Sequence, residues 1–178
     1  IPEGRLFFVN EPVIEVTAPI IEAQLAETFI VNQVNLQSLL ATKASRCVWA
    51  AQGRVLSDFA SRRTQGVDAA LKMARCSYIA GYQSTSNVLA ARRYGITPAG
   101  TMAHSFVSSF TSETAAFRAY VKAFPGRAIL LLDTYDTLVG ARRAVEVAKE
   151  LEAGGHRLLA VRLDSGDFDV LSKEVRRI

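Results

Sequence analysis

The sequence predicts an α/β protein in which parallel strands alternate with helices. From Gly53 onward, short apolar runs alternate with windows in which apolar residues recur every three or four positions. That alternation is typical of βα units and a parallel sheet. The last two runs, at 128–133 and 158–164, are almost continuously apolar, which is typical of strands covered on both faces. Polar side chains follow every run, and ligands bind at this edge of a parallel sheet.

The first 53 residues follow a different pattern. Residues 1–18 contain two β-like segments, "RLFFVN" and "VIEVTA", joined by a turn-forming Asn-Glu-Pro. From Pro19 the apolar residues take a helical spacing, which predicts one long, mostly buried helix with proline in its first turn. We therefore expect a β segment at 1–18, a connecting helix at 19–53 and βα units at 54–178.

Five βα units follow the long helix. The predicted strands lie at 54–60, 77–81, 97–101, 128–133 and 158–164, and the helices lie near 66–75, 85–93, 112–123, 138–153 and from 168 onward. Five units fit either an open doubly wound sheet or most of a (β/α)₈ barrel. A complete barrel typically takes about 250 residues, so the chain would hold a little over half of one. Because it starts on Ile and stops inside a predicted helix, we expect a piece of a longer polypeptide.

Composition narrows the class of protein. The chain has 178 residues, of which 49% are apolar and 21% charged, an ordinary globular composition. It has neither an apolar run long enough to span a membrane nor a signal peptide at its start. Cys47 and Cys76 are too few and too far apart for a disulfide framework, and their apolar or helical surroundings are typical of reduced core thiols. We expect a cytoplasmic protein with no membrane partner.

The positive charge is modest and scattered. The net charge is +4, and the arginine pairs are spread along the chain as Arg62-Arg63, Arg92-Arg93, Arg142-Arg143 and Arg176-Arg177. A nucleic-acid site would need these side chains gathered on one face, so we expect no nucleic-acid partner. Arginine pairs suit small anionic ligands, because a guanidinium binds two oxygens of a phosphate or carboxylate at once. For one of Arg62 and Arg63, a purely solvent-facing role is an equally good interpretation.

Hydroxyl and carboxylate side chains supply further candidates. Ser84, Thr85 and Ser86 open a predicted helix, where hydroxyls and free N–H groups can bind an anion, although at least one of the three is expected simply to cap the helix. The aspartates after the last two strands can hold Mg²⁺ through water or bind sugar hydroxyls; they are Asp133, Asp164 and Asp167. The "LDSGD" segment also forms an Asx-type turn, so Asp164 or Ser165 is expected to be partly structural.

The chain has only two histidines, and we expect different roles for them. His104 follows a Gly-Thr turn after the third run, with no histidine or cysteine nearby to share a metal. This position at a polar strand end favours catalysis over a buried core role. His156, in "AGGHR" after a helix, is expected to be a C-terminal cap or a surface residue. No P-loop, HExxH, CxxC, GxSxG or GxGxxG motif is present. The set suits a phosphorylated sugar, an anionic co-substrate and Mg²⁺, and does not suit acyl hydrolysis or redox chemistry.

Three long segments carry a family resemblance. "GYQSTSNVLAARRYGITPAGTMAHSFV", "AFRAYVKAFPGRAILLLDTYDTLVGARRAVEVAKEL" and "VRLDSGD" resemble the nicotinate phosphoribosyltransferase family, and the match extends almost end to end. The resemblance implies a partial α/β barrel of the type II phosphoribosyltransferase kind beside a smaller domain that includes residues 1–18. It implies ATP-coupled transfer of a phosphoribosyl group from 5-phosphoribosyl 1-pyrophosphate to nicotinate, giving nicotinate mononucleotide and pyrophosphate in NAD biosynthesis. Mg²⁺, ATP as co-substrate and a homodimer are implied with it.

The resemblance also assigns roles to residues. His104 corresponds to the histidine that ATP phosphorylates, Thr101 to the threonine of the nicotinate pocket, and Arg162 to the arginine of "RLDSGD"; Arg62 or Arg63 would meet the pyrophosphate-bearing substrate. Asp133 and Asp164 complete the expected catalytic set. The expected substrate-binding residues are Arg62, Arg63, Ser84, Ser86, Gly100, Thr101, Ser105, Arg162 and Ser165.

Two alternatives remain. The sister family that acts on nicotinamide carries an aspartate where this chain has Ser86, and an aspartate would repel the carboxylate of nicotinate. Serine at this position therefore predicts the acid as substrate. A non-catalytic scaffold of the same fold is the second alternative, although it would have no physical need for the five polar residues Thr101, His104, Asp133, Arg162 and Asp164. Because the last barrel strands and an N-terminal segment of the family are missing, we expect the chain alone to be inactive.

Overall fold

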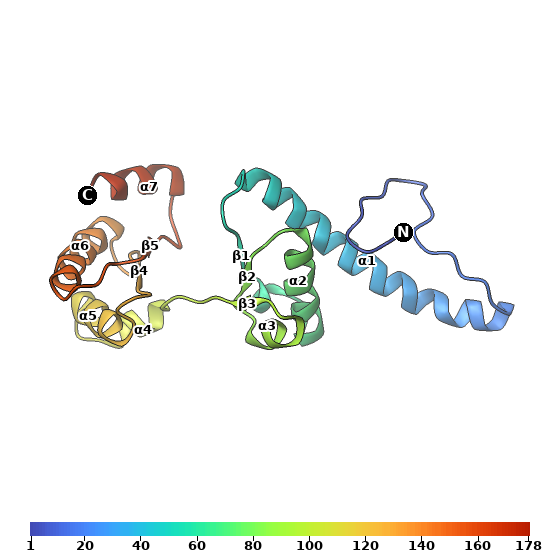
Figure 1. Cartoon of the computed structure of the whole chain (residues 1–178), viewed down its shortest axis with the longest axis horizontal. Helices are drawn as coiled ribbons and strands as arrows, with labels where there is room; N and C mark the ends of the chain where they lie inside the picture. The colour runs from blue at the N-terminus through green and yellow to red at the C-terminus, as the bar shows by residue number, and fades with distance from the viewer. The chain divides into compact units, whose positions relative to one another are not determined.

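A computed structural model describes every residue from Ile1 to Ile178 and divides the chain into two units, Ile1–Gly100 and Thr101–Ile178. Figure 1 shows the elements of each unit. In both units the paired strands run parallel with helices connecting them, so the predicted α/β class is confirmed. Closure into a partial barrel and the boundaries at residues 18 and 53 stay predictions.

The first unit carries a three-stranded parallel sheet in the order β1-β2-β3. Ser57 pairs with Ser84 and Ser84 pairs with Thr97, so successive strands are neighbours in the sheet. The unit consists of α1 (Ile20–Ala51), β1 (Ser57–Asp58), the short 3₁₀ helix η1 (Ser61–Arg63), α2 (Val67–Ala80), β2 (Ser84–Thr85), α3 (Val88–Tyr94) and β3 (Thr97–Pro98).

The second unit is built on two parallel strands and holds the larger apolar core. Leu130, Leu131 and Leu132 are fully buried, with Phe117 and Val147 packed around them from the flanking helices. Ile129 pairs with Ala160 at the start of the ladder. The unit consists of α4 (His104–Ser108), α5 (Glu113–Ala123), β4 (Ile129–Leu131), α6 (Thr137–Ala153), β5 (Ala160–Arg162) and α7 (Phe168–Arg177).

Helix α6 shows how the sequence positions these elements. It begins where Asp136 Oδ1 accepts a hydrogen bond from the Val139 backbone N–H at 2.8 Å, an N-cap. It ends where the His156 N–H donates to the Leu151 carbonyl at 3.2 Å, and the His156 side chain is exposed, as predicted. Near its start, Gly140 lies so close to β4 that a Cβ would be 2.2 Å from the Leu132 carbonyl oxygen. Only glycine allows the helix to pack this closely on the strand.

The long helix is present. The prediction that it is mostly buried is wrong. Ala44 is its only buried residue, whereas Ile20, Phe29 and Trp49 are 78%, 69% and 79% exposed. The helix packs along one side against α2 (Figure 1). The apolar spacing correctly reports an amphipathic helix, but one neighbouring helix covers only a narrow strip of its surface.

Residues 1–18 contain no β-strand, so the two strands predicted there are wrong. Turns occupy Glu3–Gly4 and Val9–Asn10, and the Phe8 N–H donates to Glu11 Oε2 at 2.7 Å. A strand needs a partner for its backbone groups, and these residues pair with no other strand. A salt bridge of 2.6 Å between Glu3 and Arg75 instead attaches the segment to α2.

Two further differences concern strands. The segment 77–81, predicted as a strand, covers the end of α2 and its cap: Cys76 and Ser77 are buried along the helix, and the helix ends at Gly81, which has φ +120°. The strand that follows is Ser84–Thr85. Strand β4 is covered on both faces as predicted, but β5 is not, since Val161 is 41% exposed.

Two short helices and one exposed thiol differ from the sequence-based expectation. The helices η1 and α4 were not predicted, because three to five residues are too few to show a helical spacing. Both cysteines are free; Cys76 is buried, which raises the pKa of its thiol, but Cys47 is exposed on α1 and is not a core thiol. None of the helices is long and apolar enough to cross a membrane.

Candidate active site

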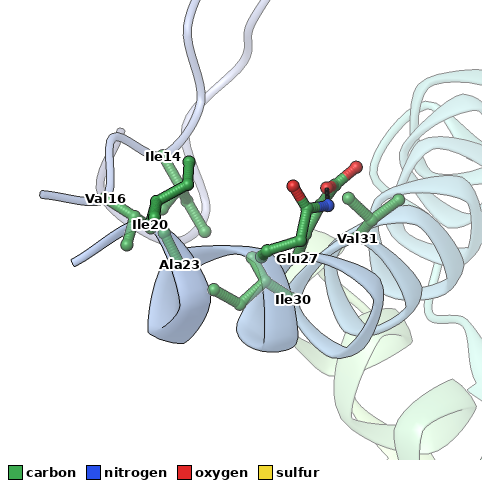
Figure 2. Close-up of a pocket in the computed structure, with 8 residues that line it drawn as sticks. Ile14, Val16, Ile20, Ala23, Glu27, Ile30 and Val31 are labelled. Atoms are coloured by element: carbon green, nitrogen blue, oxygen red, sulfur yellow. Dashed lines mark hydrogen bonds between the residues drawn. The ribbon is translucent and has the colours of Figure 1, made fainter. Parts of the chain in front are cut away.

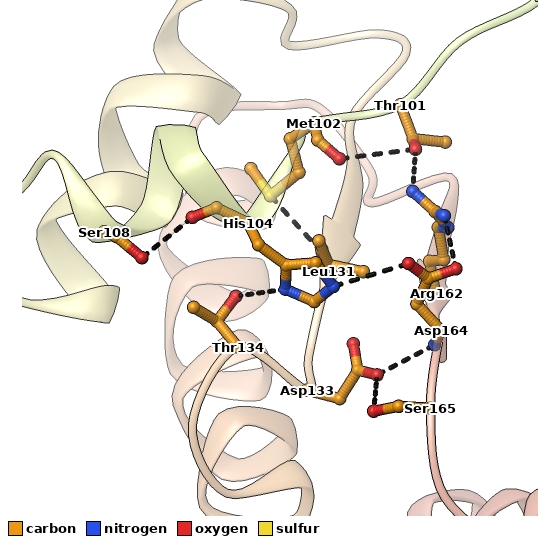
Figure 3. Close-up of polar contacts among 10 residues, drawn as sticks. All are labelled: Thr101, Met102, His104, Ser108, Leu131, Asp133, Thr134, Arg162, Asp164 and Ser165. Atoms are coloured by element: carbon orange, nitrogen blue, oxygen red, sulfur yellow. Dashed lines mark hydrogen bonds and ion pairs between the residues drawn. The ribbon is translucent and has the colours of Figure 1, made fainter. Parts of the chain in front are cut away.

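Polar side chains of the second unit meet at the carboxyl ends of β4 and β5 (Figure 3). Asp133 and Thr134 follow β4, whereas Arg162 ends β5 and Asp164 follows it. Because the two strands are parallel, these residues lie at the same edge of the sheet.

His104 is the first residue of α4 and reaches both strand ends. Its Nδ1 lies 3.1 Å from the Thr134 hydroxyl oxygen, and its Nε2 lies 3.4 Å from Asp164 Oδ2. The side chain is 43% exposed, so the ring belongs to the site surface and not to the apolar core. Both ring nitrogens therefore have a polar neighbour at this edge of the sheet, and the contact at Nε2 is the longer of the two.

Arg162 is the second centre of the network. Its Nη1 donates to the Thr101 hydroxyl at 2.6 Å, and its Nη2 donates to Asp164 Oδ1 at 2.5 Å. Asp164 thus lies between a guanidinium and an imidazole (Figure 3). Burial by itself raises the pKa of Asp164, but the hydrogen bond and charge of Arg162, together with those of His104, outweigh it and hold the pKa below its ordinary value. Asp164 is a carboxylate at neutral pH.

Asp133 joins the ends of the two strands. Its Oδ2 accepts hydrogen bonds from the Asp164 backbone N–H at 3.0 Å and from the Ser165 hydroxyl at 2.5 Å. Its Oδ1 is buried and has no hydrogen-bond partner in the protein. A buried carboxylate oxygen in this state is a free acceptor for a ligand proton, a water or a cation.

The carboxylates of this site form no complete set of metal ligands. No group of three or more histidine, cysteine, aspartate or glutamate side chains is placed to hold a metal ion. Asp167 caps α7, where its Oδ1 accepts from the N–H groups of Asp169 and Val170 at 3.0 and 3.2 Å. Mg²⁺ usually keeps several waters and binds one or two carboxylates plus substrate phosphates. The free Oδ1 of Asp133 fits that mode of binding, and a cage made wholly of protein ligands is absent.

Two residues of this cluster had no role predicted from the sequence. In the sequence, Thr134 is one of several polar residues that follow β4. Its contact with His104 is seen only in the folded structure. Met102 is buried, and its sulfur receives the Leu131 N–H at 3.3 Å; nothing in the sequence distinguished it from a core residue. Ser105 is exposed on α4, next to His104.

The remaining candidates belong to the first unit. Arg62 and Arg63 are both exposed on η1, and Gly100 is exposed at the end of the unit. Ser84 is buried in β2, and its hydroxyl contacts that of Ser57.

None of the three hydroxyl residues caps the helix, contrary to prediction. The cap of α3 is Asn87, whose Oδ1 accepts from the Ala90 N–H at 3.0 Å. The reason is that β2 continues through Ser84 and Thr85, which places these two residues before the helix.

A pocket of the first unit brings η1 next to the start of α3. Ser61 and Ser86 both line it, and the Ser61 hydroxyl oxygen is buried without a partner. The other lining residues are Thr64, Gly66, Val67, Ala70, Asn87 and Val88. Ser86 therefore lies in a cavity wall together with Ser61 of η1, but Arg62 and Arg63 of η1 do not line the cavity.

A second groove of this unit is apolar. It lies along the first turns of α1 (Figure 2) and is lined by Ile14, Val16, Ile20, Ala23, Gln24, Glu27, Ile30 and Val31. Glu27 is its only ionisable residue, so the groove lacks the basic and hydroxyl groups that an anionic substrate needs.

The fold and the cluster at the strand ends define an α/β protein with a histidine–aspartate–arginine site on parallel strands. Comparison with known proteins identifies the family: the sequence model of the nicotinate phosphoribosyltransferase (NAPRTase) family matches residues 55–177. The chain belongs to this family, as its motifs predicted.

Individual relatives agree. The chain is 58% identical over 177 residues to nicotinate phosphoribosyltransferase pncB2 of Mycobacterium tuberculosis, covering 98% of the chain and 37% of that protein. It is 44% identical over 179 residues to the Bacillus subtilis nicotinate phosphoribosyltransferase, covering 99% and 36%. The crystal structure of human nicotinic acid phosphoribosyltransferase superposes with a TM-score of 0.91 at 34% identity, covering 99% of this chain and 45% of that one. The chain thus spans little more than a third of the length of the two bacterial relatives.

Proposed function

We propose that the intact protein transfers the phosphoribosyl group of 5-phosphoribosyl 1-pyrophosphate to nicotinate, forming nicotinate mononucleotide and pyrophosphate with ATP as co-substrate. The observation that carries the proposal is the connected cluster of Thr101, Arg162, Asp164 and His104, joined by contacts of 2.5–3.4 Å. Membership in the nicotinate phosphoribosyltransferase family supports the choice of reaction.

The polar groups suit a displacement at the anomeric carbon of the sugar. The ring nitrogen of nicotinate is already a nucleophile, so it needs orientation more than activation. Arg162, with Thr101 at its side, provides a planar donor for the nicotinate carboxylate. As the bond to pyrophosphate breaks, positive charge develops on the sugar, and preorganised carboxylates such as Asp164 stabilise it.

His104 is placed to couple ATP to this reaction. In the proposed step, the lone pair of one imidazole nitrogen attacks the γ-phosphorus of ATP, the bond to the bridging oxygen breaks, and ADP leaves. Thr134 holds the ring at Nδ1, and the nitrogen that attacks is Nε2, which makes the longer contact, 3.4 Å to Asp164, and gives it up to the phosphorus. Water later hydrolyses the phosphohistidine and returns the free ring. This is covalent energy coupling by a nucleophilic side chain.

A magnesium ion fits the same cluster. Asp133 Oδ1, with Asp164 beside it, would hold Mg²⁺ through bound water, and the ion would supply charge neutralisation for the phosphate groups.

Nicotinate is preferred over nicotinamide in this proposal because Ser86 is uncharged. Ser86 lines the pocket beside η1, where an aspartate would accept a hydrogen bond from an amide but repel a carboxylate. A scaffold role is the less favoured alternative, since a scaffold gains nothing from Asp133, which is buried with one oxygen left free.

The test is an assay of the intact protein for pyrophosphate release, with nicotinate or nicotinamide and with or without ATP. We expect release with nicotinate, faster in the presence of ATP, and loss of the ATP effect in His104→Ala. Preference for nicotinamide would support the sister activity, and no release with either base would support a scaffold. An unchanged ATP effect in His104→Ala would reject His104 as the phosphoacceptor.

A further inference from the structure

Met102 is a buried residue between two residues of the candidate site, and no step of the proposed reaction uses it. Thr101 precedes it directly, and His104 follows with one residue between them. Met102 is 4% exposed and is the only buried residue among residues 101–105. Its contribution to the site therefore comes from its contacts inside the protein.

The sulfur of Met102 binds one edge of strand β4. The Leu132 N–H donates to the Arg162 carbonyl of β5 at 3.1 Å. Successive residues of a strand point their N–H groups to opposite edges, so the Leu131 N–H points away from β5. Met102 Sδ accepts from this N–H at 3.3 Å (Figure 3). Leu131 is fully buried, so its N–H depends on an acceptor supplied by the protein.

This contact anchors the chain on the N-terminal side of His104. On the other side, Phe106 packs against Phe110 and Tyr120, with ring centroids 4.9 and 5.9 Å apart. These rings fasten α4 to the apolar core from the residues after His104. Before His104, Met102 alone is buried, so its side chain links this part of the chain to the core.

The same link reaches Thr101. Its hydroxyl accepts from Arg162 Nη1 at 2.6 Å and donates to the Met102 carbonyl at 3.4 Å. Arg162 is the last residue of β5, and β5 pairs with β4. Thr101 is thus held against β5 by its own side chain, and against β4 through the side chain of Met102.

We propose that Met102 is a positioning residue whose thioether fastens residues 101–104 to the edge of β4 and so sets where Thr101 and His104 lie relative to the strand ends. The roles of Thr101 toward nicotinate and of His104 toward ATP rest on the proposed function. A thioether suits the task, because it is long, flexible and apolar, and its sulfur is a weak acceptor.

Three substitutions separate the acceptor from the apolar bulk. Met102→Leu keeps a similar volume and removes the acceptor, which leaves the Leu131 N–H unpaired. Met102→Gln supplies an amide oxygen on a side chain of similar length, although its NH₂ group would also be buried. Met73→Leu is the matched control, since Met73 is the only other methionine of the chain and is half-buried on α2 of the first unit.

The first measurements are made by NMR on the intact protein and need no turnover. In Met102→Leu we expect the Leu131 amide to exchange its hydrogen about tenfold faster, in line with the loss of one hydrogen bond. The Leu132 amide, which is bonded to β5, should change much less. The ring-nitrogen shifts of His104 should move in Met102→Leu and stay unchanged in Met73→Leu.

The second measurements are kinetic and are made well below the melting temperature of every variant. We expect Met102→Leu to slow the labelling of His104 by γ-labelled ATP about tenfold and to raise the KM for nicotinate about tenfold. Met102→Gln should recover part of both losses, and Met73→Leu should stay within about twofold of the parent protein.

Several results would overturn the proposal. A lower melting temperature with unchanged labelling, nicotinate KM and His104 shifts would show that Met102 is merely structural. Unchanged exchange of the Leu131 amide in Met102→Leu, or kinetics no better in Met102→Gln than in Met102→Leu, would reject the sulfur as an acceptor. If Met102→Gln does not fold, the amide exchange and ring shifts of Met102→Leu decide. Altered exchange and ring shifts in a protein that neither labels His104 nor transfers a phosphoribosyl group would support the positioning role and reject the proposed function.

Discussion

The Nδ1 atom of His104 lies 3.1 Å from the hydroxyl oxygen of Thr134, which comes from the end of a different element. The contact holds the imidazole ring at Nδ1 and so determines the direction in which Nε2 points. A histidine nucleophile depends on such a partner, because the partner sets both tautomer and orientation.

Replacing Thr134 with valine should therefore impair phosphorylation of His104. We expect the rate of phosphate incorporation from labelled ATP to fall about tenfold, in line with the loss of one orienting hydrogen bond to a reacting group. Thr134→Ser keeps the hydroxyl and is the control. Equal labelling of the valine variant and the parent protein would show that the contact does not orient the ring.

Ser86→Asp should shift the base preference from nicotinate toward nicotinamide. The new carboxylate would repel that of nicotinate and accept a hydrogen bond from the amide, so we expect the ratio of the two kcat/KM values to change at least about tenfold. Ser86→Asn adds similar bulk without the charge and separates the two effects. Unchanged selectivity in the aspartate variant would remove Ser86 from the specificity argument.

Arg162→Gln should raise the pKa of Asp164. Burial raises this pKa, and Arg162 is the main group that lowers it, so removing the guanidinium moves the pKa upward. A carboxyl pKa that is lower in the folded state than in the unfolded state adds stability above the unfolded-state pKa, and that stability is lost as the pH falls through the folded-state value.

The measurement is carboxyl titration of Asp164 by NMR, with urea unfolding at several pH values. The stability deficit of Arg162→Gln should be largest near neutral pH and shrink as the solution becomes acidic. Arg176→Gln, which removes an exposed arginine at the end of α7, is the control. A constant deficit at every pH would contradict the assigned cause.

Gly140→Ala should destabilise the second unit. Its Cβ would lie 2.2 Å from the Leu132 carbonyl oxygen, so either α6 or β4 must shift, at a cost of about 1–3 kcal/mol in unfolding free energy. Because Asp133 follows Leu132 directly, activity should fall with stability. Gly126→Ala is the control, since a Cβ there meets nothing within 4 Å. Equal melting temperatures for the two variants would disprove the close approach.

Arg143→Met should leave a buried carboxylate unpaired. Arg143 binds Glu113 Oε2 at 2.9 Å; the Glu113 side chain is fully buried, and its Oε1 has no partner. We expect a loss of about 1–3 kcal/mol in chemical unfolding, the usual penalty for a buried polar group left unsatisfied. Arg142→Met, on the exposed side of the same helix, should change stability much less.

The sequence predicted the alternation of strands and helices because apolar spacing and capping residues are local signals. It also located Asp133 and Asp164, since each follows an apolar run. It failed at 77–81, where aromatic and β-branched residues looked like a strand but completed a helix. The preference of these residues for a strand is weaker than the stabilisation gained by packing them as the last turn of α2.

The contacts of the site could not be read from local signals. Arg162 and Thr101 are 61 residues apart in the sequence, and only the fold shows that they share a hydrogen bond. Asp58 was passed over for the same reason: a single acid at a strand end looks ordinary until Thr85, 27 residues later, is seen to bind it. The burial of the long helix could not be predicted either. An apolar stripe on a helix indicates a surface suited to burial, but it does not show which part of the protein covers that surface.

The order of the elements has a consequence for synthesis on the ribosome. Each unit is continuous in the sequence, and every strand pairs with the strand next to it along the chain. Each pairing joins two strands that are separated by a single crossover, so it needs no later part of the chain. The three-stranded sheet of the first unit can therefore form while the segment carrying His104 and Arg162 is still being translated, so that the proposed site residues are synthesised after that sheet is complete.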